Sequence, residues 1–163
     1  RGTDLNGALE FLGRVVPCKA ITVCVSDFLG QTNPSRRSMD AHLRRQVVLS
    51  ETLAQTSATA LRQANRRHDV VAVQITDPRE LGLPDVGWVV LQDAETGQIA
   101  EINTGEKRRR EAYTQRQADA QEELLRLFRT SGIDSIQLRT DEPYITALEK
   151  FFEMRLKRRH LAA

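Results

Sequence analysis

The chain has 163 residues, of which 24 are basic and 22 acidic, so its formal charge at pH 7 is only +2. This excess is too small to indicate a general polyanion-binding protein, and any basic site has to be local. A content of 40% hydrophobic and 28% charged residues is typical of one soluble globular domain. No apolar run approaches the length that crosses a bilayer, so we expect no membrane span.

The chain opens with a predicted helix and strand. Apolar residues at helical spacing follow Thr3 and Asp4, and this helix is expected to end before Pro17. The β-branched run from Ile21 to Val25 then predicts a strand that is apolar on both faces, as in the centre of a parallel sheet. Residues 35–67 are helical in pattern with one break, which predicts two helices or one interrupted helix.

The two cysteines flank the start of this first strand. The spacing of Cys18 and Cys24 fits neither a disulfide framework nor a Cys-x-x-Cys metal clip, which favours a reducing, cytoplasmic location. Cys24 is interpreted as a small buried hydrophobic residue rather than a reactive thiol. Because the sequence begins without Met and enters a helical pattern within a few residues, we expect it to be cut from a longer protein.

The middle of the chain predicts a second strand and a hairpin. The strand is expected from Val70 to Ile75, where an apolar run ends in a Thr-Asp-Pro corner. Two short runs, 88–92 and 98–103, flank a turn-forming segment and predict an antiparallel hairpin. Trp88, the only tryptophan, is expected to pack within this hairpin rather than to stand exposed.

The C-terminal part predicts a polar helix over 106–131, a short strand from Ile136 to Arg139 and a last helix over 143–159. The buried face of the last helix is expected to contain Ile145, Leu148, Phe152 and Leu156. Alternating strands and helices favour an α/β fold of Rossmann-like type with a mostly parallel sheet and helices on both faces. The three apolar strands are expected to be adjacent and parallel.

Compact catalytic signatures are absent: the sequence has no Gly-rich phosphate loop, no Gly-x-Ser-x-Gly and no His-Glu-x-x-His. What remains is Asp27 at the carboxyl tip of the first strand, where open α/β sheets bind their ligands. Together with the hydroxyl of Thr3, this carboxylate offers hard oxygen ligands that suit Mg²⁺. The alternative is structural: Thr3 caps the first helix and Asp27 caps the loop after the strand.

Four blocks follow one another along the chain: RGTDLNGALEFL, VCVSDFL, RRHDVVAVQITDPRELGLPDVGWVVLQDAETG and LFRTSGIDSIQLRTDEPYITALEKFF. In order and spacing they resemble the C-terminal half of the domain of unknown function 58 family, bacterial proteins with a von Willebrand factor A-like fold. The resemblance implies one domain over 1–163 that lacks its N-terminal strands, with a helical insertion over 31–57. It also implies that Thr3 and Asp27 belong to a metal-ion-dependent adhesion site for Mg²⁺. The Asp-x-Ser-x-Ser loop of such sites does not occur in this sequence, so the site is incomplete.

By the same resemblance, the chain is expected to be a protein-interaction module without enzymatic activity. Relatives are associated with MoxR-type AAA+ ATPases, and the implied role is the assembly or maturation of a protein complex. We also expect a homo-oligomer, because the strand from Ile21 to Val25 would lack its outer neighbour and leave an edge open to pairing.

Two alternatives come from other classes. Nucleic acid could bind the basic clusters EKRRREAYTQR and MRLKRRH, but both stand beside acidic residues on predicted helices, which favours solvated helix faces. A metal-assisted hydrolase would need a general base near the metal, and Asp77 and Glu80 are the candidates.

Overall fold

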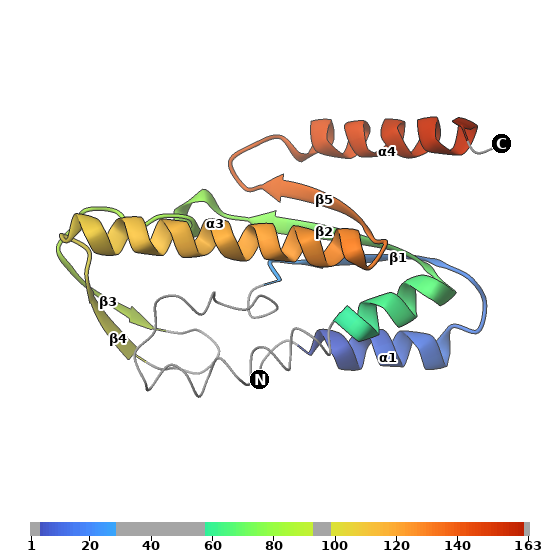
Figure 1. The fold of residues 1–163 in the computed structure, drawn as a ribbon, viewed down its shortest axis with the longest axis horizontal. Coiled ribbons are helices and arrows are strands. Elements are labelled where there is room, and N and C mark those ends of the chain that lie inside the picture. Colours follow the sequence, from blue (N-terminus) through green and yellow to red (C-terminus); the bar gives the residue numbers. More distant parts are fainter. Residues whose placement is uncertain (1–3, 29–57, 93–98, 162–163) are drawn as a thin grey trace.

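The structure is a computed structural model that describes residues 4–28, 58–92 and 99–161. Thr3 and the predicted insertion 31–57 lie outside the described residues. None of the helices within these ranges is long and apolar enough to cross a membrane. In chain order the elements are α1 (Leu5–Val15), β1 (Ile21–Ser26), a helix at residues 58–67, β2 (Asp69–Thr76), the 3-10 helix η1 (Pro78–Glu80), β3 (Trp88–Gln92), β4 (Ile99–Asn103), α3 (Lys107–Thr130), β5 (Asp134–Arg139) and α4 (Tyr144–Leu161) (Figure 1).

Strands β1, β2 and β5 form one parallel sheet in the order β1-β2-β5. Val23 of β1 is in register with Val71 of β2, and Val73 of β2 is in register with Ile136 of β5. Strands β3 and β4 form a separate antiparallel pair. The predictions of three adjacent parallel strands, a hairpin and an α/β fold are therefore confirmed.

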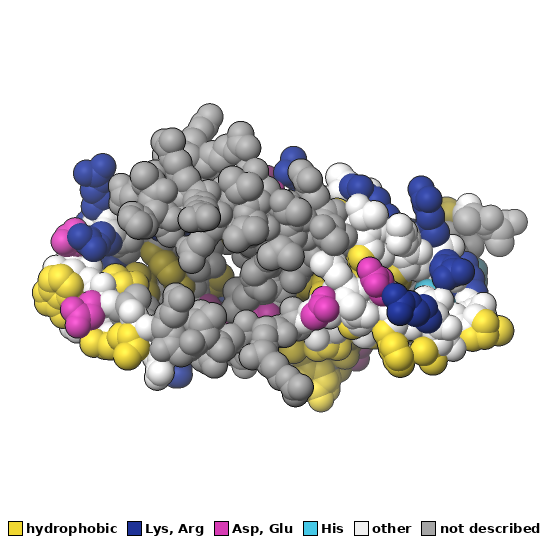
Figure 2. Space-filling view, turned by 90° about the horizontal axis from the view of Figure 1, so that it is seen from below, with side chains coloured by type: hydrophobic (Ala, Val, Ile, Leu, Met, Phe, Trp, Pro, Cys, Tyr) yellow, Lys and Arg dark blue, Asp and Glu magenta, His cyan; other side chains and the backbone are white. Residues whose placement is uncertain are grey.

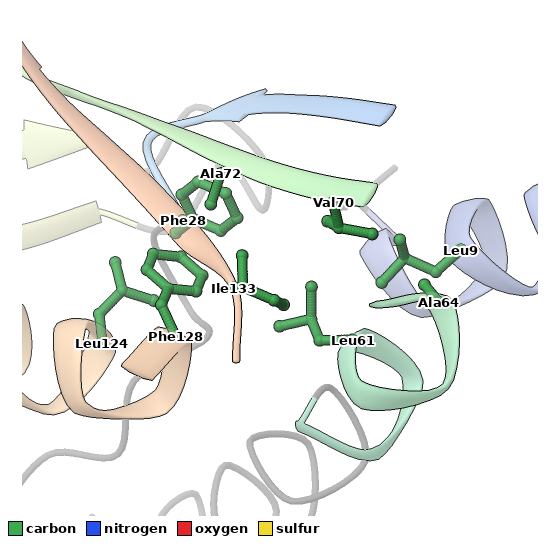
Figure 3. Packing of buried hydrophobic residues seen from close by; sticks show 9 residues of the cluster. All are labelled: Leu9, Phe28, Leu61, Ala64, Val70, Ala72, Leu124, Phe128 and Ile133. Atoms are coloured by element: carbon green, nitrogen blue, oxygen red, sulfur yellow. The ribbon is translucent and has the colours of Figure 1, made fainter. Parts of the chain in front are cut away.

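Helices lie on both sides of the sheet, with α4 on one side and α1 and residues 58–67 on the other (Figure 1). Since side chains alternate along a strand, Val70 and Ala72 of β2 point to one face, which we call the α3 face. Figure 3 shows how side chains from β2, α1, residues 58–67 and α3 converge there. This core contains Leu9, Phe28, Leu61, Ala64, Val70, Ala72, Leu124, Phe128 and Ile133.

The opposite face of the sheet, which we call the α4 face, is only partly covered. Helix α4 packs over β5 and β2, and the buried residues there are Val71, Val73, Ile136 and Phe151. Among the described residues, none packs over the β1 side chains that point to this face. Ile21, Val23 and Val25 remain 68%, 55% and 60% exposed, and we call these three residues the β1 strip.

The prediction for the buried face of the last helix is confirmed for Leu148 and wrong for the other three residues. Ile145, Phe152 and Leu156 are each more than half exposed. The side chains that meet the sheet belong to Ala147, Leu148 and Phe151. Apolar residues occur on two sides of α4, so periodicity alone allowed either side to face the core.

An ion-pair cluster fixes the side of α4 that meets the sheet. Arg155 Nη2 lies 2.6 Å from Asp69 Oδ1 at the start of β2, and Arg155 Nε lies 3.3 Å from Asp134 Oδ2 at the start of β5. The guanidinium also lies over the Phe151 ring, 5.6 Å from its centroid. The cluster therefore joins α4 to two neighbouring strands and holds Phe151 against the sheet.

The hairpin does not bury its tryptophan, so the expectation for Trp88 is also wrong. Trp88, Val90 and Ile99 share one face of the hairpin and are 71%, 66% and 67% exposed. Figure 2 shows hydrophobic side chains on the surface at the left end of the molecule, where Figure 1 places the hairpin. A two-stranded ribbon buries a side chain only where another layer packs on it, and among the described residues no layer covers this face.

Candidate functional site

The candidate site lies at the carboxyl ends of β1 and β2, where β1 ends in a sharp turn. The Ser26 hydroxyl donates to Asp27 Oδ1 at 3.3 Å and accepts from the Phe28 N–H at 3.0 Å. Phe28 has a φ of +55°, in the left-handed region that costs free energy for a residue with a Cβ. Its buried ring packs edge-on against Phe128 at 5.1 Å between centroids. The turn thus anchors Phe28 in the core and leaves the Asp27 carboxylate exposed at the tip of the strand.

Beside this turn, β2 carries a polar residue inside an otherwise apolar run. Gln74 is in register with Ser26, and its side chain is on the α3 face with Val70 and Ala72. The residue is only 6% exposed, yet in the part of the chain that the structure describes no group donates a hydrogen bond to its Oε1. Most buried polar atoms have a partner, so an unpartnered acceptor at the end of a strand indicates a place for a donor.

The segment after β2 closes the site toward α3. Asp77 caps η1, because its Oδ1 accepts from the Arg79 N–H at 2.9 Å. The Tyr113 hydroxyl of α3 donates to the backbone carbonyl of Glu80 at 3.0 Å. These two bonds hold η1 between the end of β2 and the middle of α3.

Together these elements enclose a small pocket of about 60 Å³. Its polar lining residues are Asp27, Glu80, Thr76 and three glutamines, and its apolar wall comes from all the contributing elements. The lining residues are Asp27, Phe28, Gln74, Ile75, Thr76, Glu80, Leu81, Gln117, Ala120, Gln121 and Leu124. Oxygen acceptors beside an apolar wall suit a small cationic or hydrogen-bond-donating group.

The structure places some of the site residues predicted from sequence in the pocket and others elsewhere. Asp27 lies in the pocket, whereas Thr3 lies outside the described residues, so the pairing of the two stays a prediction. Of the two candidate bases, Glu80 lines the pocket and Asp77 uses its carboxylate as a helix cap. Within residues 4–28, 58–92 and 99–161, no three His, Cys, Asp or Glu side chains gather in a way that could hold a metal ion.

Gln74 is the member of the site that sequence reasoning missed. The signal that could have found it is a single amide inside the strand DVVAVQIT, two residues before the strand ends. A polar side chain at such a position has to find a partner inside the fold or serve a ligand.

The basic clusters considered for nucleic acid are largely paired with carboxylates. At the start of α3, Arg109 lies 2.7 Å from Glu106 and Arg110 lies 3.1 Å from Asp85. At the end of α4, Arg155 bonds the strand carboxylates described above, and Arg158 lies 2.9 Å from Asp134. These cations carry structural contacts within the chain.

The two cysteines differ in environment. Cys24 packs against the core on the α3 face, and its burial raises the pKa of its thiol. Cys18 is exposed. A thiol with a raised pKa holds less of the reactive thiolate at neutral pH, in keeping with a packing role for Cys24.

Comparison with known proteins gives a family and several relatives. The family model described as "Protein of unknown function DUF58" matches residues 1–123. An uncharacterized protein of Mycobacterium avium is 32% identical over 152 residues, which cover 93% of this chain and 76% of that protein. Uncharacterized proteins of Mycobacterium bovis and Mycobacterium tuberculosis are 31% identical over 152 residues, and there the chain covers only 40% of their length. These longer relatives therefore have about 380 residues. No solved structure matches the chain significantly.

Proposed function

The chain belongs to the DUF58 family of proteins of unknown function, and on that premise we propose that it is a protein-interaction module rather than an enzyme. In this proposal the fold is von Willebrand factor A-like, and an incomplete metal-ion-dependent adhesion site lies at the carboxyl end of β1. The partner is a MoxR-type AAA+ ATPase, and the shared task is the assembly or maturation of a protein complex in the cytoplasm.

The observation that carries the proposal is the β1 strip, Ile21, Val23 and Val25. Each of the three side chains is more than half exposed, although the pattern of β1 is that of a strand buried on both faces. Among the described residues, β1 pairs with β2 on one side and with no strand on the other. An apolar strip beside an open strand edge is a surface on which another chain can bury apolar area and form backbone hydrogen bonds.

In this chain we assign that surface first to a second copy. Two β1 edges related by a two-fold axis pair antiparallel, which joins the two sheets and brings the two strips together. In relatives of about 380 residues, additional strands of the same protein can occupy the same edge. Self-association through β1 is therefore expected of these 163 residues taken alone.

Sedimentation velocity at micromolar concentration tests this assignment. The wild-type chain is expected to sediment as a dimer, and Val23→Lys, which places a charge in the centre of the strip, is expected to yield the monomer. Phe11→Lys is the matched control, because Phe11 is a similarly exposed apolar residue on α1, away from β1. A monomeric wild type, or a dimer that persists in Val23→Lys, contradicts the assignment.

The metal is proposed to be Mg²⁺ bridging Asp27 and a carboxylate of the partner. One carboxylate and the hydroxyl of Thr3 are few ligands for an ion that takes about six oxygens, so binding by this chain alone is expected to be weak. Calorimetric titration of MgCl₂ should show this weak binding and its loss in Asp27→Ala, with little change in the free energy of unfolding because Asp27 is exposed. Tight binding that survives Asp27→Ala contradicts the proposed position.

The partner is tested by titrating a fluorescently labelled chain with a purified MoxR-type AAA+ ATPase and measuring anisotropy. Binding that strengthens with Mg²⁺ and weakens in Asp27→Ala supports the proposal, and no binding with or without Mg²⁺ contradicts it. A salt-dependent mobility shift with DNA or RNA would instead favour the nucleic-acid alternative.

A further inference from the structure

Gln74 is a buried acceptor without a donor, beside a pocket that opens to solvent. Its Oε1 is unpartnered although the residue is 94% buried, and the side chain lines the pocket at the ends of β1 and β2. A desolvated amide oxygen without a donor lowers the stability of the folded protein. A ligand that brings a donor into the pocket therefore recovers this loss.

The other walls of the pocket define the chemistry of that donor. Asp27 and Glu80 contribute two carboxylates, one from the end of β1 and one from η1. Leu81 and Leu124 contribute apolar surface. The preferred group is thus positively charged at its tip, able to donate several hydrogen bonds, and aliphatic behind the tip.

We propose that this pocket receives a lysine side chain of the protein partner. The ammonium group has three donors, which match the Gln74 amide oxygen and the two carboxylates, and its methylene stem packs on the leucines. A compact ammonium needs less room than a planar guanidinium with five donors, which suits a pocket of about 60 Å³. The inference rests on the proposed interaction function and names the side chain that the module recognises. Because Asp27 also serves the proposed metal, Mg²⁺ and lysine compete.

The test uses a lysine peptide and nuclear magnetic resonance on the full chain. Acetyl-Ala-Lys-Ala-amide is titrated into ¹⁵N-labelled protein while the Gln74 side-chain amide resonances are followed. A single inserted side chain should give a dissociation constant on the order of 1 mM. The control peptide carries acetyllysine, which has the same stem without the charge, and its binding is expected to be at least about 10-fold weaker.

Two variants separate recognition from folding. Gln74→Leu removes the amide in a similar volume and should weaken lysine binding at least about 10-fold, as read from backbone amides of the pocket. Gln137→Leu is its control, because Gln137 is the register partner of Gln74 on β5 but is exposed and outside the pocket. Glu80→Gln, at an exposed residue, tests the charge without touching the core.

Equal binding of the two peptides, or unchanged binding in both Gln74→Leu and Glu80→Gln, overturns the proposal. Movement of the Gln74 resonances by MgCl₂ but not by the lysine peptide also overturns it, in favour of a metal ion. The sedimentation test of the β1 strip does not involve this pocket. A dimer broken by Val23→Lys together with no lysine binding would therefore refute the pocket alone.

Discussion

The two faces of the three-stranded sheet are covered to very different extents. On the α3 face, side chains from two helices before β2 and one helix after the hairpin meet Val70 and Ala72, which are 1% and 0% exposed. On the α4 face, one helix covers β2 and β5, and the β1 strip stays exposed. One strand shows the contrast within itself, since Cys24 packs in the core while its neighbours Val23 and Val25 face solvent.

This difference teaches that the sequence of β1 suits a central position in a sheet, which the described residues do not provide. An edge strand commonly carries charges or a proline that discourage pairing with other chains. Strand β1 has the sequence ITVCVS, with neither. Its composition is that of a central strand, which is why we propose that another segment or another copy completes the α4 face.

The largest expected effect comes from removing an aromatic ring from the α3 face. Phe128 is 0% exposed and packs against Phe28, so Phe128→Ala leaves a cavity and should lower the free energy of unfolding by about 3–5 kcal/mol. Phe152→Ala on α4 removes the same ring from a side chain that is 57% exposed, and should cost much less. Urea denaturation of both variants measures the contrast. Similar losses would show that the side of α4 turned away from the sheet is covered as well.

The second effect concerns the ion pairs that attach α4. In Arg155→Met the carboxylates of Asp69 and Asp134, each with a side chain about 25% exposed, lose a partner. The expected loss is about 2 kcal/mol, below the value for a fully buried pair because water still reaches these groups. Arg14→Met is the control, since its pair with Glu10 is largely exposed and should be worth less than about 1 kcal/mol. A loss in Arg155→Met no larger than in the control would mean that α4 is held by apolar contacts alone.

Most of the fold could be predicted from the sequence, because strands and helices here have clear apolar periods and turn residues between them. The side of α4 that faces the sheet could not, since Phe151 and Phe152 are adjacent and the ion pairs that α4 forms with β2 and β5 choose between them. The exposure of Trp88 was missed for a similar reason, because an apolar alternation does not tell whether a second layer exists.

The candidate site, like the fold, could be predicted from the sequence only in part. Asp27 could be predicted because a carboxylate after an apolar run marks the end of a strand. Gln74 and Glu80 could not be placed beside it, because they meet Asp27 only through the parallel pairing of β1 with β2 and the return of the chain along α3. The pocket is a product of tertiary arrangement rather than of a motif.

A third prediction uses the two thiols to report which side of β1 is covered. Because burial raises the pKa of Cys24, its thiolate fraction at neutral pH is reduced, and packing limits access to it. A disulfide reagent should label Cys18 at least about 10-fold faster than Cys24, as followed by mass spectrometry of the peptides. In Phe128→Ala, labelling of Cys24 should accelerate relative to Cys18. Equal rates in the wild type would show that the α3 face opens readily at β1.

The smallest expected effect is the pH response of the turn between β5 and α4. Arg139 donates to both oxygens of Asp141, at 3.0 and 2.9 Å, and this hydrogen-bonded cation lowers the pKa of the Asp141 carboxyl. Because the folded-state pKa is lowered, the contribution to stability is present above the unfolded pKa of about 4 and is lost as pH falls through the folded value. Both groups are exposed, so solvent screens the pair and the effect is slight.

Asp141→Asn should therefore leave stability nearly unchanged at about pH 3 and lower it slightly at about pH 7, which flattens the dependence of the unfolding free energy on pH. Urea denaturation at both pH values measures this flattening. The double variant Arg139→Gln with Asp141→Asn is the control and should be as flat as Asp141→Asn alone, since the two residues act as one pair. A wild-type slope that persists in Asp141→Asn would mean that the turn contributes nothing to the attachment of α4 through this carboxylate. Such a result would leave the Arg155 cluster as the main electrostatic contact between α4 and the sheet.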